Sequence, residues 1–100
     1  MEQRRPEWTV FSNHGTVLFY VATNPDATLR QISDAVGITE RQVGRIVRNL
    51  AEAGMVRIER LGRRNLYAFN PEARLRHPTL AHVPLGPIIA AIASAPKPMG

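Results

Sequence analysis

Three arginines recur at helical spacing between residues 39 and 53, and their chemistry gives the first indication of a site. On a helix that advances about 100° per residue, Arg41, Arg45 and Arg48 would lie within roughly 60° of one another. A guanidinium group donates two parallel hydrogen bonds in one plane, which suits phosphate groups and the edge of guanine. Gly44 lies among them and would let such a helix approach a surface closely. The spacing therefore predicts a cationic face that binds phosphates and base edges.

The apolar residues of the same stretch fall on the opposite side of that helix. They have the spacing of a buried helical face and are Val43, Ile46, Val47 and Leu50. Thr39 precedes them as the expected N-terminal cap, and Ile38 as a buried spacer. The pattern predicts a helix over residues 39 to 53, with one face for packing and the other for a ligand.

A shorter helix is expected just before this one. Thr28 can cap free backbone N–H groups, and Leu29, Ile32 and Val36 follow it at helical spacing. Gly37 ends the helix, because a residue without Cβ adopts the left-handed conformation at low cost. The sequence therefore predicts two short helices joined by a tight turn.

A β-hairpin is expected directly after the second helix, once Gly54 has ended it. Apolar and polar residues alternate over residues 56–59 and again over residues 67–69, on either side of a glycine-containing turn. The expected tip is mostly basic and consists of Arg60, Gly62, Arg63, Arg64 and Asn65.

The two predicted helices resemble the helix-turn-helix of bacterial and archaeal DNA-binding proteins. The residues in register with that motif are Leu29, Ile32, Ser33, Val36, Gly37, Ile38, Val43 and Ile46. The resemblance implies that the second helix is a recognition helix lying in the major groove. A plain helical hairpin in a protein core has the same apolar spacing, but it leaves the arginines and the following hairpin unexplained.

With the hairpin added as a wing, the chain resembles the MarR-like and ArsR-like group of small winged helix regulators over about residues 13 to 70. The run AEAGMVRIERLGRRNLY is especially typical of them. The implied fold is mainly α with a small β-hairpin (α+β): a three-helix core, a wing and a C-terminal apolar helix. ArsR-like metal sensors use cysteines or clustered histidines and acids, which this chain lacks. Larger MarR-like members carry longer flanking helices that build a ligand pocket, so a small-molecule effector remains unknown here.

Three segments are expected along the chain. They are an N-terminal arm over residues 1–12, the winged helix-turn-helix DNA-binding domain over 13–76, and a C-terminal segment over 77–100. Within the domain, Asn13 is the expected cap of a first helix that runs to about Thr23. Pro25 cannot continue that helix.

The C-terminal segment contains a second candidate contact surface. A short helix over residues 85 to 95, with Pro87 in its first turn, would have hardly any polar face and would need burial. It could fold back on its own domain or meet a second copy of the chain. In small winged helix regulators the terminal helices commonly form the dimer interface, so the resemblance favours a homodimer. The residues predicted for that interface are Leu85, Ile88, Ile89 and Ile92.

Composition excludes several classes of protein. A chain of 100 residues is one domain, and its net charge of +5 is carried by twelve arginines and a single lysine against eight acids. The chain has no cysteine, which excludes disulfides and thiolate zinc sites. Its three histidines lack dependable spacing for a shared metal ion. No signal peptide, membrane span or catalytic constellation is present. We expect a cytoplasmic protein that is not an enzyme and holds no metal or other cofactor.

These observations predict sequence-specific binding to double-stranded DNA in transcriptional regulation, as a homodimer on an inverted repeat. The predicted DNA-binding residues are Thr28, Thr39, Glu40, Arg41, Gln42, Arg45, Arg48, Arg60, Arg63, Arg64 and Asn65. Two alternatives remain open at this point. The domain could serve protein–protein contact, or it could bind DNA as a nonspecific architectural protein.

Overall fold

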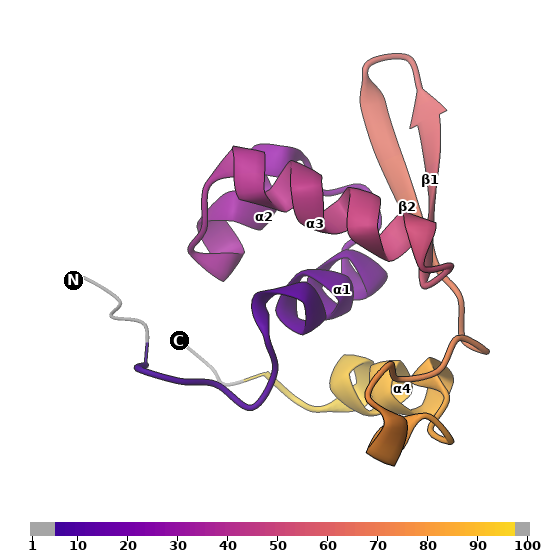
Figure 1. Ribbon diagram of the computed structural model, residues 1–100. Helices are drawn as coiled ribbons and strands as arrows, with labels where there is room; N and C mark the ends of the chain where they lie inside the picture. The colour runs from indigo at the N-terminus through magenta and orange to yellow at the C-terminus, as the bar shows by residue number, and fades with distance from the viewer. Residues whose placement is uncertain (1–5, 98–100) are drawn as a thin grey trace.

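The computed structural model describes residues 6–97, so the first five residues of the predicted N-terminal arm lie outside the described part. Figure 1 shows a stack of helices beside a long hairpin, with a further helix beneath the stack. The elements are α1 (Asn13–Thr23), α2 (Leu29–Val36), α3 (Glu40–Glu52), β1 (Val56–Leu61), β2 (Arg64–Phe69), the 3-10 turn η1 (Pro78–Leu80) and α4 (Leu85–Ser94). The predicted fold class, mainly α with one β-hairpin, is confirmed.

The starts of α1, α2 and α3 are fixed by side-chain caps. Thr28 and Thr39 each accept a hydrogen bond from the backbone N–H three residues later, and each forms a capping box with the glutamine at that position. Both caps were predicted. At α1 the cap is Ser12, whose Oγ accepts from the Gly15 N–H at 3.3 Å, and Asn13 is already the first helical residue. The prediction of Asn13 as the cap is therefore wrong by one position.

The turn between α2 and α3 follows the predicted scheme. Gly37 has a φ of 85°, in the left-handed region, and its N–H donates to the Ser33 carbonyl at 2.8 Å. The Ser33 hydroxyl donates to the Ile38 carbonyl across the same turn. Ile38 itself is half-buried rather than buried, and it packs against the edge of the core. The two helices are thus held in a fixed relative orientation by backbone geometry and one short side chain.

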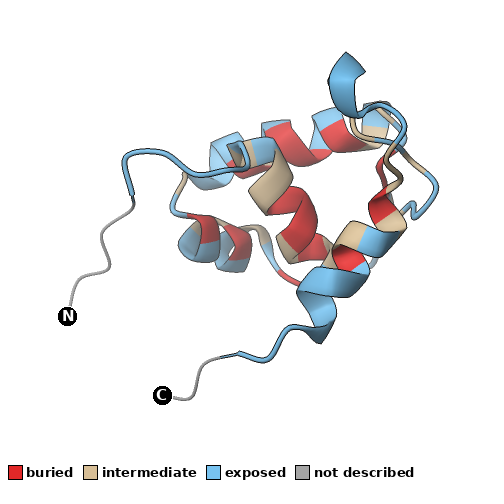
Figure 2. Ribbon diagram, turned by 90° about the horizontal axis from the view of Figure 1, so that it is seen from below, coloured by how far each residue is buried: buried red, intermediate tan, exposed pale blue. Residues whose placement is uncertain are grey.

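One apolar core joins all the helices and the base of the hairpin. Figure 2 shows the buried residues on the inward faces of the elements. The core contains Val17, Leu18, Phe19, Val21, Ala27, Ile32, Val36, Val43, Ile46, Val47, Leu50, Met55, Val56, Tyr67, Leu85 and Ile89. Every apolar residue predicted for the inner face of α3 is in this set. The buried residues of α3 therefore lie on its inner face, and the arginines on its outer face are exposed.

The hairpin is attached to the helices at its base. Its antiparallel register pairs Val56 with Phe69 and Leu61 with Arg64, and Gly62 provides the positive φ of 61° at the turn. The Tyr67 N–H donates to the Pro25 carbonyl at 2.9 Å, so β2 is bonded to the turn between α1 and α2. This bond places the hairpin beside the start of α2.

The C-terminal segment folds back on the same domain. The N–H of Leu85 donates to the Ala73 carbonyl at 2.8 Å, and the N–H of Gly86 donates to the Pro71 carbonyl at 2.9 Å. α4 then packs against α1, as Figure 1 shows. Two of the four residues predicted for a dimer interface, Leu85 and Ile89, are only 0% and 4% exposed within the single chain. Their place in that interface needs correction, because the chain's own core already covers them.

No helix among residues 6–97 is both long enough and apolar enough to span a membrane.

Candidate nucleic-acid interface

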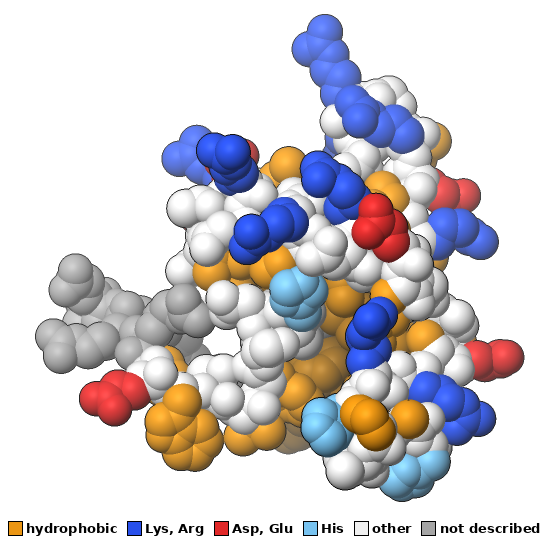
Figure 3. All heavy atoms as spheres, viewed as in Figure 1, with side chains coloured by type: hydrophobic (Ala, Val, Ile, Leu, Met, Phe, Trp, Pro, Cys, Tyr) orange, Lys and Arg blue, Asp and Glu red, His pale blue; other side chains and the backbone are white. Residues whose placement is uncertain are grey.

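The outer face of α3 carries the cationic surface that the spacing predicted. The side chains of Arg41, Gln42, Arg45 and Arg48 are exposed and together line a shallow hollow. Figure 3 shows arginines gathered over this helix and at the tip of the hairpin, on the same part of the surface. A Cβ added at Gly44 would meet nothing within 4 Å, so this face has an unobstructed point of approach.

The arginines of α3 are not neutralised by the protein's own acids. Among residues 6–97 the structure records one ion pair, and it joins Arg64 to Asp26. Arg41, Arg45 and Arg48 therefore present unpaired charge to solvent. Glu40 is the one acid in the first turn of this helix, where a carboxylate interacts favourably with the helix dipole.

Two of the predicted DNA-binding residues at the start of α3 already have partners in the protein. The Gln42 side-chain Oε1 accepts from the Thr39 N–H at 2.9 Å and from the Thr39 hydroxyl at 3.1 Å. The Thr39 hydroxyl therefore donates its proton to Gln42 within the cap and cannot donate to a ligand at the same time. The side-chain NH₂ of Gln42 remains available as a donor. The Thr28 hydroxyl, by contrast, accepts from the Gln31 N–H at 3.1 Å and keeps its own proton for another acceptor.

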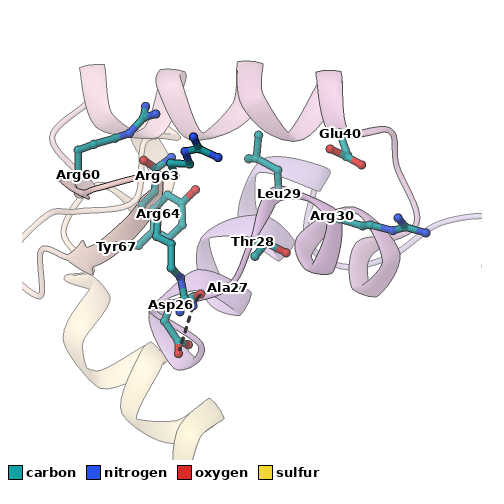
Figure 4. Close-up of a pocket in the computed structure, with 11 residues that line it drawn as sticks. Asp26, Ala27, Thr28, Leu29, Arg30, Glu40, Arg60, Arg63, Arg64 and Tyr67 are labelled. Atoms are coloured by element: carbon teal, nitrogen blue, oxygen red, sulfur yellow. Dashed lines mark hydrogen bonds and ion pairs between the residues drawn. The ribbon is translucent and has the colours of Figure 1, made fainter.

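The hairpin arginines differ in the freedom of their side chains. The Arg64 Nη2 donates to the Asp26 backbone carbonyl at 2.9 Å and lies 3.8 Å from the Asp26 carboxylate, so it points back to the body of the domain (Figure 4). Arg60 donates through Nε to the Gly62 carbonyl at 3.3 Å, within the hairpin turn. Arg63 is exposed and has no recorded partner among the described residues. It is the freest cation at the tip, while Asn65 is half-buried.

A groove of about 360 Å³ separates the hairpin from the start of α2. Figure 4 shows arginines of the hairpin on one side of it, and Thr28 and Leu29 on the other. Three polar residues that line the groove, Asp26, Arg30 and Tyr67, were absent from the DNA-binding residues predicted from the sequence. The sequence contained only weak signals for them, since the turn at Asn24-Pro25-Asp26 predicted only the end of a helix and Tyr67 predicted only a buried strand position.

Two of the three histidines, His14 and His77, contact other polar groups through their rings. The His14 Nε2 lies 3.1 Å from the Asn49 Nδ2 on α3, which ties the first turn of α1 to the C-terminal half of that helix. The His77 Nδ1 accepts from the Thr79 N–H at 3.2 Å and caps η1. Within residues 6–97 there is no group of three or more histidine, cysteine or acidic side chains that could hold a metal ion.

The domain has a capped helix, α2, followed by a helix, α3, with one buried apolar face and one exposed arginine face, and then a basic hairpin. This arrangement defines the winged helix-turn-helix class of DNA-binding domain. A family model described as "MarR family" matches residues 12–64, which is more than half of the chain. The protein belongs to the MarR family, and the class predicted from the sequence, a DNA-binding transcriptional regulator, is confirmed.

Solved structures share this fold at low sequence identity. A predicted DNA-binding transcriptional regulator from E. coli superposes with a TM-score of 0.56 at 17% identity, covering 77% of this chain and 70% of that one. MepR, a transcription regulator of the Staphylococcus aureus multidrug efflux pump MepA, gives 0.55 at 18% identity, with 82% and 56% covered. ZitR of Lactococcus lactis gives 0.57 at 14% identity, with 94% and 57% covered.

This chain therefore spans little more than half the length of MepR and ZitR. A search of curated proteins gave no match.

Proposed function

We propose that the protein regulates transcription by reading a specific DNA sequence with the outer face of α3. Arg41 and Arg45 lie in the first half of that helix and would contact base edges in the major groove, with Gln42 donating through its side-chain NH₂. Arg48 is one turn further along and would bind a phosphate. The observation that carries the proposal is that these arginines are exposed and unpaired on a helix whose opposite face is fully packed.

The hairpin would supply the second contact. Arg63 projects from the tip without a partner among the described residues, which suits insertion along the backbone or into a narrow minor groove. Arg64 would contribute mainly by holding the hairpin against the turn between α1 and α2. The two contacts would lie on neighbouring grooves of one duplex.

Selection of bound duplexes from a random DNA pool tests this proposal directly. A regulator should enrich one sequence, and the enriched duplex should bind at least a hundredfold more tightly than random DNA of equal length at physiological salt. Equal binding to both duplexes would support the architectural alternative. No binding to either would favour a role in protein–protein contact.

We also propose a homodimer that binds an inverted repeat. The support is a set of apolar side chains that the single chain does not cover: Ile92 is 38% exposed, Ile88 is half-buried, and Trp8 and Val10 of the arm are 78% and 84% exposed. Burying these side chains against a second copy would remove them from water. Sedimentation equilibrium of the protein alone tests the dimer, and half-sites about one helical turn apart in the selected DNA test the symmetry.

A further inference from the structure

The groove between the hairpin and α2 is lined by the hydroxyl end of a largely buried tyrosine. Tyr67 is 4% exposed and its ring belongs to the core, yet its hydroxyl has no hydrogen-bond partner among residues 6–97. Figure 4 shows the hydroxyl oxygen directed into the space between the hairpin arginines and the start of α2. Among the described residues no buried side-chain oxygen or nitrogen lacks a hydrogen-bond partner, so the Tyr67 hydroxyl is reached by solvent from the groove and can donate to a bound acceptor. The groove thus contains a positioned donor that lacks an acceptor.

The opposite wall supplies further donors. α2 begins at Leu29, and the first N–H groups of a helix have no acceptor within it. The amides of Leu29 and Arg30 have no recorded acceptor among the described residues, and the Thr28 hydroxyl keeps its proton. The positive end of the helix dipole lies at the same place. These groups and the Tyr67 hydroxyl line one groove, so they can act on one acceptor.

The charge around the groove also favours an anion. Its lining includes four arginines against the carboxylates of Asp26 and Glu40, and Asp26 already lies 3.8 Å from Arg64. The remaining arginines, Arg30, Arg60 and Arg63, have no acidic partner recorded within residues 6–97. A small oxyanion with several acceptor oxygens fits this set of donors better than a neutral or cationic group.

We propose that this groove holds one phosphate of the DNA backbone, bound by the Tyr67 hydroxyl and the first-turn amides of α2. The inference rests on the proposed DNA binding and adds a contact that lies on neither α3 nor the hairpin tip. Glu40, the first residue of α3, lines the same groove, so the site is continuous with the surface of that helix. A phosphate held here fixes the distance between the major-groove helix and the hairpin along the duplex. Tyr67 is therefore a positioning residue that carries no sequence preference of its own.

The test pairs Tyr67→Phe with a duplex in which single phosphates are replaced by neutral methylphosphonates. Tyr67→Phe removes the hydroxyl and keeps the buried ring, so the thermal midpoint should stay close to that of the wild type. It should weaken binding to the selected duplex about tenfold, as the loss of one hydrogen bond to a charged acceptor does. At one phosphate position in each half-site, the methylphosphonate should weaken the wild type strongly and the variant much less.

A second pair of variants tests the amide wall without touching the tyrosine. Leu29→Pro removes one N–H at the first helical position, where proline is tolerated, and Thr28 has an extended backbone (φ −78°, ψ 163°) that proline accepts after it. Leu29→Ala is the matched control, since it removes the side chain and keeps the N–H. We expect Leu29→Pro to bind more weakly than Leu29→Ala, with the difference confined to the same phosphate.

The failures are distinguishable. If the wild type selects no duplex, the proposed function is overturned and this inference with it. Two results would overturn only the phosphate site, provided that the wild type binds its duplex. One is that Tyr67→Phe binds equally well. The other is that the effects of Tyr67→Phe and of the methylphosphonate on affinity add up at every phosphate position tested. The alternative ligand for this groove is a free phosphate ion. To test this, inorganic phosphate is titrated at constant ionic strength and the NMR resonances of the Leu29 and Arg30 amides are followed. If these resonances shift while Tyr67→Phe leaves DNA binding unchanged, the assignment to the DNA backbone is overturned.

Discussion

The guanidinium group of Arg64 is fastened to Asp26, with Nη2 at 2.9 Å from the backbone carbonyl and 3.8 Å from the carboxylate. These residues lie on β2 and on the turn between α1 and α2. The contact joins the hairpin to the helical body at a second point, beside the backbone bond from Tyr67 to Pro25. Two neighbouring arginines in the sequence, Arg63 and Arg64, therefore have different roles.

The first prediction separates those roles. Arg63→Ala and Arg64→Ala remove the same charge, but Arg63→Ala should lower the slope of log affinity against log salt by about 1 and leave stability unchanged. Arg64→Ala should lower the free energy of unfolding by about 0.5–1 kcal/mol, since its hydrogen bond to the carbonyl is partly exposed to water. Asp26→Asn keeps that carbonyl and removes a pair whose side chains are 61% and 70% exposed, so it should change stability little. Salt-dependent binding and urea unfolding measure both effects. Identical behaviour of the two alanine variants would contradict the assignment.

The second prediction concerns base reading by α3. Arg41→Ala and Arg45→Ala should each cost about 1–3 kcal/mol on the selected duplex and less on random DNA, because a lost base contact matters only where the right base is present. Arg48→Ala should weaken both duplexes equally. Arg76→Ala, in the exposed segment between the hairpin and α4, is the control for the change in charge. Competition binding on the two duplexes gives the comparison, and parallel losses for all four variants would rule out base reading.

The third prediction uses two glycines to separate stability from binding. Gly44→Ala should raise the thermal midpoint by about 5 °C, because alanine favours a helix interior by roughly 1 kcal/mol and the added Cβ meets nothing within 4 Å. The same Cβ should weaken DNA binding if α3 approaches the duplex at this point. Gly37→Ala is the matched control: its φ of 85° makes the substitution destabilising by about 1 kcal/mol. A Gly44→Ala variant that is stabilised and binds with full affinity would show that the helix does not approach there.

The fourth prediction tests the two sides of α4. Leu85→Ala should destabilise the chain by about 2–4 kcal/mol, since Leu85 is fully buried in the core. Ile92→Glu should leave the folded chain intact, because that side chain is 38% exposed, and should shift sedimentation toward the monomer. A monomeric wild type, or a dimer unaffected by Ile92→Glu, would remove Ile92 from the interface.

Local signals were enough to predict the helix-turn-helix and the hairpin. Thr28 and Thr39 each stand three residues before a glutamine, Gly37 follows the last apolar position of its helix, and the hairpin alternates on both sides of Gly62. Each of these features acts within a few residues, so the sequence pattern contains it. The exposed arginine face follows from helical period alone.

The rest depended on contacts between distant segments. Tyr67 alternates like any buried strand residue, and only its place opposite α2 leaves the hydroxyl facing a groove. Asp26 meets Arg64 across 38 residues of chain. The resemblance favoured a dimer interface for Leu85 and Ile89, whereas the backbone bonds from Leu85 and Gly86 to residues 73 and 71 turn α4 back so that both side chains lie in the core.

The bond from Tyr67 to Pro25 also bears on which length changes the domain tolerates. An inserted residue between α1 and α2 would displace the carbonyl that receives β2, and the hairpin would change its angle to α3. An insertion at Gly62, where an added Cβ would meet nothing within 4 Å, would lengthen the reach of the hairpin and leave that angle as it is. Related domains with this bond should therefore vary in hairpin length far more readily than in the length of the first interhelical turn.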